Sequence, residues 1–190
     1  MKINYPNPTI NNERFETFKS HGMLFENSLN ISNEYYRLHE KAIIYKKPTP
    51  IQVVKVNYPM RSQAKIVEAY YKTPSTTDYN GIYRGKYIDY EAKETNNPSF
   101  AFKHIFDHQI KHLVNVYKAG GIAFVIIYFR KFNEVHIISI RDFYDLFIQG
   151  QNGGRKSISI ETARKIGVQA KLGYTPPIDY LSAVDKLFFS

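Results

Sequence analysis

The run Ile122–Phe129, IAFVIIYF, is the longest apolar stretch of this 190-residue chain, and it limits the folds open to it. Eight residues are too few to cross a bilayer, which takes about 20 residues of helix. An uninterrupted apolar run of this length is typical of a strand that is buried on both faces. Gly120 and Gly121 come directly before it, as glycines do where a helix ends. The stretch Val135–Ile140 is predicted to be its antiparallel neighbour.

The rest of the chain alternates between helical and strand patterns. Apolar residues at helical spacing predict a helix within Gly22–His39 and another from about Phe102 to Tyr117. Short strands are expected at Ala42–Tyr45 and Gln52–Val56. Further helices are expected in the C-terminal part, where one begins within Phe143–Ile148, one begins at Ser159 with Thr162, and one covers Leu181–Phe188. This order predicts an α/β fold with a mixed central β-sheet flanked by helices.

The length fits one domain that can bury a real core. We place it at residues 22–190, behind a polar arm at residues 1–21 that shows no periodicity and is expected to be flexible. The chain has no cysteine, which excludes disulfides and zinc sites with cysteine ligands. The N-terminus, MKINYPNPTI, has no apolar signal core. We therefore expect a soluble protein of the cytoplasm that does not enter a membrane.

Positive charge is concentrated in one segment. The chain carries a formal net charge of +9, which suggests an anionic partner. Residues 41–72 hold seven lysines and arginines against one acid, Glu68, with four tyrosines among them. Basic and aromatic side chains in alternation suit phosphate contacts and base stacking, and the plainer alternative is a solvated lysine surface. The DNA-binding candidates of this segment are Lys46, Lys47, Lys55, Arg61, Lys65 and Lys72.

A hairpin is predicted within Ser75–Thr95, and its register decides which acids meet. Side chains alternate between the two faces of a strand, so Asp89, Glu91 and Lys93 share one face. A turn at Arg84-Gly85 would bring Asp78 opposite Glu91, whereas a turn at Asn80-Gly81 would leave Glu91 without an acidic partner. Opposed carboxylates destabilise a sheet unless something sits between them.

A divalent cation between Asp78 and Glu91 would remove that repulsion. Two carboxylates and a nearby lysine, Lys93, are the groups needed for phosphodiester hydrolysis. Gln109 falls within the apolar stripe of the second helix and is expected to point toward the sheet, where its amide needs partners. The alternatives are an ordinary polar hairpin with a surface Glu–Lys pair, and a Gln109 at the margin of the stripe.

Two other polar clusters have less support as catalytic sites. His104, His108 and His112 would form a row along the second helix, which is better explained by a nucleic-acid backbone or solvent than by a metal. The loop at residues 151–157 is rich in glycine and contributes Arg155 and Lys156 as further DNA-binding candidates. Its spacing does not match a nucleotide-binding P-loop. The residues alone thus indicate a basic α/β protein of the metal-dependent nuclease class.

Several strings of the sequence are more specific than these patterns. They are Lys46-Lys47-Pro48-Thr49-Pro50-Ile51-Gln52, Ser75-Thr76-Thr77-Asp78-Tyr79-Asn80-Gly81, Glu91-Ala92-Lys93-Glu94-Thr95, His108-Gln109-Ile110 and Gly153-Gly154-Arg155-Lys156-Ser157-Ile158. With them the chain resembles, over nearly its whole length, the RecU Holliday junction resolvases of low-GC Gram-positive bacteria and mollicutes.

This resemblance implies a type II restriction-endonuclease-like fold, a homodimer, and symmetric nicking of four-way DNA junctions that depends on Mg²⁺ or Mn²⁺. Asp78, Glu91 and Gln109 would then hold the metal, and Lys93 would serve the attacking water. Residues of about 50–75 would form a stalk that enters the junction. The resemblance also implies recombination and DNA repair as the setting, with recombinase and branch-migration proteins as partners.

Departures from the family pattern leave further questions. His21-Gly22-Met23 stands where the family usually has Arg-Gly-Met, and Pro176-Pro177 replaces a usual Pro-Arg. Three additional site candidates are Glu26 on the first helix, Asp89 on the catalytic face, and Thr76 in the Ser-Thr-Thr-Asp string. The remaining alternatives are a junction-binding protein without catalysis and a sequence-specific endonuclease of linear duplexes.

Overall fold

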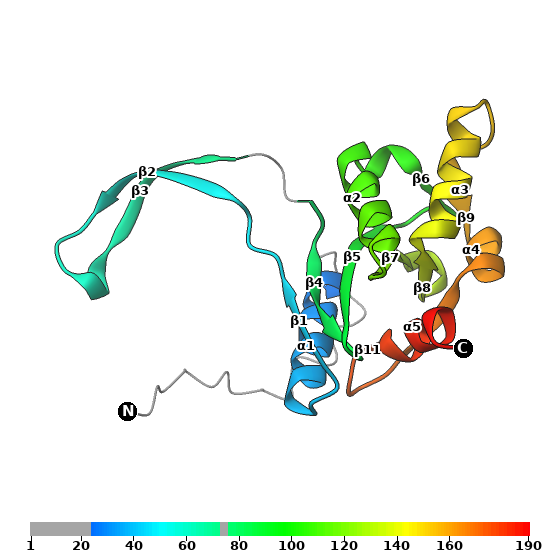
Figure 1. Cartoon of the computed structure of the whole chain (residues 1–190), viewed down its shortest axis with the longest axis horizontal. Helices are drawn as coiled ribbons and strands as arrows, with labels where there is room; N and C mark the ends of the chain where they lie inside the picture. The colour runs from blue at the N-terminus through cyan, green and yellow to red at the C-terminus, as the bar shows by residue number, and fades with distance from the viewer. Residues whose placement is uncertain (1–23, 73–75) are drawn as a thin grey trace.

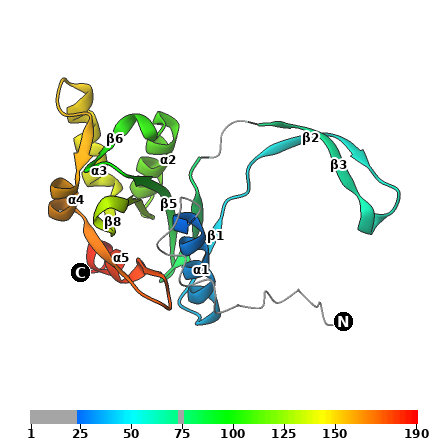
Figure 2. The same ribbon diagram turned by 180° about the vertical axis from the view of Figure 1, so that it is seen from behind.

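A computed structural model describes residues 24–72 and 76–190, with the side chains of Leu24 and Arg61 excepted. The predicted arm at residues 1–21, and the His21-Gly22-Met23 departure, lie outside the described residues. The described chain forms a body of one large sheet with helices on both faces, from which a long two-stranded ribbon projects (Figures 1 and 2). No helix within the described residues is long and apolar enough to cross a membrane.

The large sheet is mixed, as the element order predicted. Its strands lie in the order β1 (Ala42–Lys46), β4 (Tyr79–Tyr83), β5 (Lys86–Thr95), β7 (Ile122–Phe129), β8 (Glu134–Ser139), β10 (Val168–Leu172) and β11 (Ile178–Asp179). Strands β5 and β7 are parallel, whereas the other neighbours in this sheet are antiparallel. The apolar run is therefore the central strand, and β8 is its antiparallel neighbour as expected.

Helices cover both faces of this sheet and bury two separate cores. One core contains side chains of α1 (Leu24–Leu38) and α5 (Leu181–Phe188). The other contains side chains of α2 (Asp107–Lys118), α3 (Ile140–Gln151) and α4 (Ile160–Ile166). Because β7 sends alternate side chains into each core, both of its faces must be apolar. This α/β layering is the architecture expected of a type II restriction-endonuclease-like fold.

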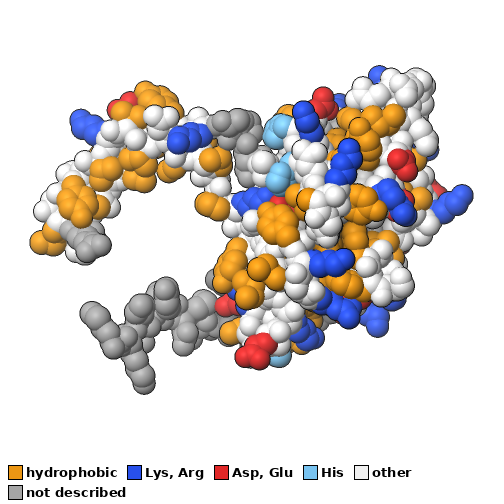
Figure 3. Space-filling model, in the orientation of Figure 1, with side chains coloured by type: hydrophobic (Ala, Val, Ile, Leu, Met, Phe, Trp, Pro, Cys, Tyr) orange, Lys and Arg blue, Asp and Glu red, His pale blue; other side chains and the backbone are white. Residues whose placement is uncertain are grey.

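The projecting ribbon, which we call the stalk, consists of β2 (Ile51–Asn57), the short 3₁₀ turn η3 (Arg61–Gln63) and β3 (Lys65–Tyr71). All the side chains of β2 and β3 are exposed. Figure 3 shows many hydrophobic side chains along the stalk with a few basic ones among them. A lone two-stranded ribbon is marginally stable in water. The stalk therefore presents an apolar and aromatic surface that is suited to a partner.

The structure corrects the start of the second predicted helix. Residues Phe102–His104 form a 3₁₀ turn, η4, and α2 begins only at Asp107. The backbone N–H of Phe106 is satisfied by the side-chain oxygen of Gln109 at 3.1 Å, so the helix starts there. His104 consequently does not belong to a helical row with His108 and His112.

Several short elements were not predicted from the sequence. Strand β3 was not expected, and neither were the two strands at the C-terminal edge of the large sheet. The same holds for the separate antiparallel pair β6 (Ser99–Ala101) and β9 (Ser157–Ser159), and for the 3₁₀ turn η5 (Arg130–Phe132). The third helix begins at Ile140, three residues before the expected stretch, because the Ser139 hydroxyl caps it by accepting from the N–H of Asp142.

Candidate active site

The β4–β5 hairpin turns at Arg84-Gly85, which is the register that brings Asp78 level with Glu91. Arg84 and Gly85 have positive φ angles of 49° and 74°, as the tight two-residue turns of hairpins require. Tyr83 pairs with Lys86, and the ladder continues to Tyr79 opposite Tyr90. The alternative turn at Asn80-Gly81 is wrong.

Those two residues lie in the middle of β4, where Gly81 lies against β1. A Cβ atom on Gly81 would come within 1.9 Å of the carbonyl oxygen of Ile43. Gly81 is therefore needed for the close approach of β4 to β1, and the chain reverses at Arg84-Gly85 instead.

Glu91 is the buried centre of the site. Its side chain has no exposed surface, and its Oε1 atom accepts hydrogen bonds from Gln109 Nε2 at 2.7 Å and from Lys93 Nζ at 2.6 Å. Its Oε2 atom is buried and has no hydrogen-bond partner among the described residues. Burial above all, and then the charge of Asp78, raise the pKa of Glu91 to about 7, although Lys93 and Gln109 act in the opposite direction.

Asp78 lies directly before β4, one position beyond the pair formed by Tyr79 and Tyr90. Its Oδ2 atom accepts the backbone N–H of Ala92 at 3.0 Å, which fixes the carboxylate against β5. A carboxylate pair with one unpartnered buried oxygen is a donor set that a hard divalent cation prefers. Within the described chain, no group of three or more histidine, aspartate or glutamate side chains is arranged to hold a metal ion. The two carboxylates therefore fit a cation that takes its other ligands from water and phosphate.

Gln109 points inward from α2, as its place in the helical stripe predicts. Its amide oxygen accepts the backbone N–H of Phe106, and that N–H identifies the oxygen, so the NH₂ group must face Glu91. In this arrangement Gln109 orients the carboxylate by donating to it. To act as the predicted metal ligand, its amide would have to turn over and give up both hydrogen bonds.

Asp89 was assigned no role from the sequence. Its carboxylate is fully buried and is bonded by four side chains, so we call it the hub. It accepts hydrogen bonds from Lys47 Nζ at 2.8 Å, from the Tyr87 hydroxyl at 2.8 Å and from the hydroxyl of Thr77. His112 Nε2 lies 3.0 Å from the same carboxylate. This network connects both ends of the stalk to β5 and α2.

Two residues predicted to belong to the functional site, Lys47 and Thr76, take part in this network. The ammonium of Lys47, predicted to contact DNA, is occupied by Asp89 and the two threonine hydroxyls, and its side chain is only 14% exposed. Thr76 lies 3.1 Å from that ammonium, so it belongs to the root of the stalk. Glu26 forms an ion pair with Lys46.

The other basic candidates are divided between two regions. Lys55 and Lys65 lie on the stalk, and Lys72 follows it. A hollow of about 370 Å³ at the stalk root is lined by Lys46, Lys47, Lys72 and Asp78, among others. Arg155 and Lys156 come directly before β9, at the end of the body away from the stalk (Figures 1 and 2). The structure therefore does not bring these last two to the carboxylates.

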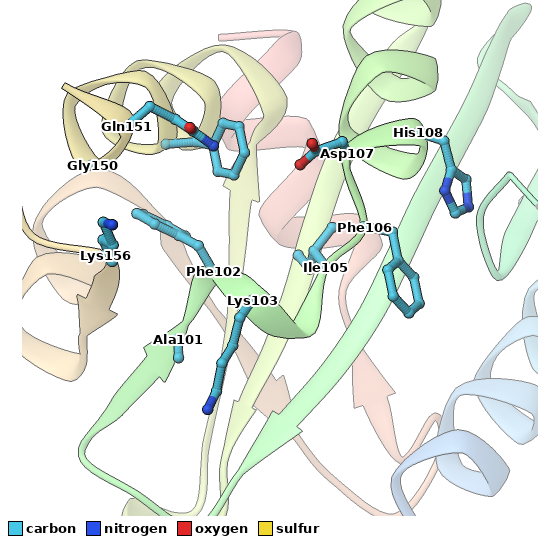
Figure 4. Close-up of a pocket in the computed structure, with 11 residues that line it drawn as sticks. Ala101, Phe102, Lys103, Ile105, Phe106, Asp107, His108, Gly150, Gln151 and Lys156 are labelled. Carbon is cyan, nitrogen blue, oxygen red and sulfur yellow. The ribbon is translucent and has the colours of Figure 1, made fainter.

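Phe106, whose backbone N–H donates to Gln109, was not singled out from the sequence. Phe106 lies directly before α2, is 62% exposed, and its ring stacks on that of His108 with centroids 5.6 Å apart. It borders a depression of about 830 Å³ between α2 and α3, whose lining is drawn in Figure 4. The sequence did contain a signal for this residue. Phe106 is an aromatic residue outside the apolar stripe, and it comes immediately before the helix that carries the inward Gln109.

Comparison with known proteins identifies close relatives. Residues 20–186 match the family described as RecU, Recombination protein U. The protein named Holliday junction resolvase RecU from Listeria monocytogenes serotype 4a is 47% identical, with the full length of both chains covered. A protein of the same name from Geobacillus sp. is 51% identical over 91% of this chain and 87% of its own. Among solved structures, the Holliday junction resolvase Hjc of Archaeoglobus fulgidus matches with a TM-score of 0.45 and 11% identity, over 78% of this chain and 95% of its own.

Proposed function

Because the chain belongs to the RecU family, we propose that it is a Holliday junction resolvase, a nuclease that cuts four-way DNA junctions by paired hydrolysis of phosphodiester bonds. The observation that carries the catalytic part of the proposal is the buried, unpartnered Oε2 atom of Glu91 beside Asp78. A fold tolerates a buried carboxylate oxygen without a partner where a ligand completes it.

The carboxylates of Asp78 and Glu91 would hold Mg²⁺, or Mn²⁺ in its place. When bound, such a cation polarises the scissile phosphate and lowers the pKa of a water. Gln109 and Lys93 both hold Oε1 of Glu91, which leaves Oε2 for the cation. The ammonium of Lys93 is partly exposed, so it can also orient the attacking water or stabilise the negative charge that develops on the phosphate.

The stalk would enter the junction and contact its strands. Lys55, Lys65 and Lys72 supply charge for phosphates, while exposed tyrosines such as Tyr70 and Tyr71 supply surfaces on which bases can stack. We further propose a homodimer, since paired cuts in opposed strands require two active sites. Recombinase and branch-migration partners in the cytoplasm remain proposals that rest on the family.

The test is cleavage of a labelled four-way junction and a matched linear duplex, each with Mg²⁺ or with EDTA. We expect paired nicks in the junction alone, abolished by EDTA. Cutting of the duplex with equal efficiency would indicate a duplex endonuclease, and binding without cutting under every metal tried would indicate a non-catalytic binding protein. Either result refutes the proposal.

Two variants assign the roles of the carboxylates. Asp78→Asn and Glu91→Gln should abolish cleavage and keep junction binding, because the stalk is unchanged. Glu34→Gln, on the exposed face of α1, is the matched control and should cut normally. If the two site variants lose binding as well as cleavage, the carboxylates have a structural role instead.

A further inference from the structure

Phe106 is an exposed aromatic residue beside the catalytic carboxylates. The residue is 62% exposed, while Phe102 and Ile105 just before it are 5% and 3% exposed and belong to the core. The body has no need of this ring for its own packing. A single exposed apolar side chain is common on a protein surface, and what sets Phe106 apart is its connection to Glu91 through Gln109.

Two hydrogen bonds in series fix the ring relative to the site. The backbone N–H of Phe106 donates to Gln109 Oε1 at 3.1 Å, and Gln109 Nε2 donates to Glu91 Oε1 at 2.7 Å. Because the backbone of Phe106 forms one of these two hydrogen bonds, the residue cannot move without disturbing the amide that holds Glu91. A DNA strand with a phosphate at Glu91 therefore has its neighbouring nucleotides close to Phe106.

The surroundings of the ring favour a polyanion. His108 stacks on it at an interplanar angle of 10°. Figure 4 shows the two rings side by side at one end of the depression, turned away from Phe102 and Lys156 at its other end. Between residues 103 and 112 the ionisable side chains are Lys103, His104, Asp107, His108, Lys111 and His112, of which only Asp107 is acidic. Two acids of β5 face this segment, Glu91 and Asp89, and each is paired with a lysine, Lys93 and Lys47 respectively. Such a surface attracts a phosphate backbone and would repel a second copy of itself.

We propose that the Phe106 ring, backed by His108, stacks on the nucleobase next to the scissile phosphate and helps to select the cleavage position. This inference rests on the proposed function, because it needs the phosphate at Asp78 and Glu91. Stacking between a base and an aromatic side chain changes affinity by about 5- to 150-fold per base. Bases differ in how well they stack, so one ring at this position can favour some cleavage steps over others.

The first test uses the absence of tryptophan from the chain. Phe106→Trp introduces a single tryptophan whose fluorescence is quenched when a base stacks on it. With EDTA present, a four-way junction should quench this fluorescence, and an abasic site at one position beside the cleavage point should restore it. Tyr117→Trp, near the C-terminal end of the same helix, is the control and should not respond.

The second test is single-turnover cleavage with Mg²⁺ on junctions that differ in the bases at the cleavage point. Phe106→Ala should slow cleavage at the preferred step by about 5- to 150-fold and reduce the differences in rate between junctions. Phe106→Trp should retain them. Because the ring is exposed, the thermal midpoint of Phe106→Ala should stay unchanged.

Unaltered preferences in Phe106→Ala, together with a tryptophan signal that ignores abasic sites, would overturn the inference. A change from dimer to monomer in Phe106→Ala without any tryptophan quenching would show that the ring covers a second copy, which also overturns it. Failure of the unmodified protein to cut any junction would refute the proposed function instead. The fluorescence measured in EDTA separates these cases, because it does not depend on cleavage.

Discussion

Glu91→Gln is expected to make the metal-free protein more stable while it abolishes cleavage. The fold buries the Glu91 side chain completely and leaves one of its oxygens without a partner. The resulting pKa of Glu91 is about 7 against an ordinary value of 4.5. At about 1.4 kcal/mol per pKa unit, keeping this carboxylate charged costs the folded state about 3 kcal/mol.

The pH window follows from the direction of this shift. Because the folded pKa lies above the unfolded one, folding favours the protonated side chain. The penalty is therefore absent below pH 4.5, grows as the pH rises toward 7, and is constant above that value. Glutamine carries no charge, can still accept the hydrogen bond from Gln109, and lets the partly exposed Lys93 turn to solvent.

Urea unfolding in EDTA at several pH values between 5 and 8 measures this effect. The free energy of unfolding of the unmodified protein should fall across the range relative to Glu91→Gln, and the variant should be the more stable by about 3 kcal/mol at pH 8. Glu34→Gln, at an exposed position, is the control. Mg²⁺ should stabilise the unmodified protein and not Glu91→Gln. Equal stabilities at pH 8 would refute the reasoning that the buried charge of Glu91, with its Oε2 atom unpartnered, destabilises the metal-free fold.

Three further predictions concern the cation, the hub and the stalk. Since protons compete for Glu91, the apparent Mg²⁺ affinity measured by calorimetry should fall roughly tenfold per pH unit below about 7, and a flat profile would exclude Glu91 as a ligand. Asp89→Asn removes the buried charge that pairs with the largely enclosed Lys47 and should cost about 3 kcal/mol in urea unfolding; a loss below about 1 kcal/mol would contradict its role as a hub. Lys55→Gln and Lys65→Gln should each lower the slope of log affinity for the junction against log salt by about one unit, and an unchanged slope would mean that these lysines do not touch phosphates.

The sequence predicted those features that depend on local patterns. The alternation Ile88-Asp89-Tyr90-Glu91 assigns each side chain to a face, and the positive φ angles at Arg84-Gly85 need the glycine that the sequence provides. The apolar run of β7 and the boundaries of α5 follow from hydrophobicity and period in the same way. These properties belong to short windows of the chain.

What the sequence did not predict depends on contacts between distant residues. The stripe Phe102, Ile105 and Gln109 resembles one continuous helix, yet the amide of Gln109 bonds the backbone of Phe106 and sets the helix start there. The short strands β6 and β9 become strands only by pairing across more than 50 residues. The periodicity of a short segment carries no information about such distant pairings, so these strands could not be predicted from the sequence pattern.

The hub at Asp89 shows why the stalk and the active site must be considered together. The backbone N–H of Lys47 donates to the carbonyl of Asp78 at 2.8 Å, and the ammonium of the same lysine bonds Asp89, which lies two residues before Glu91. Thr77 bonds the same carboxylate from the returning end of the stalk. Both roots of the stalk are thus fixed to the hairpin that carries Asp78 and Glu91, the two carboxylates of the proposed catalytic site. If the stalk holds the junction as we propose, these contacts would place it at a set distance from Glu91, and the geometry of the stalk root would determine which phosphate reaches the carboxylates.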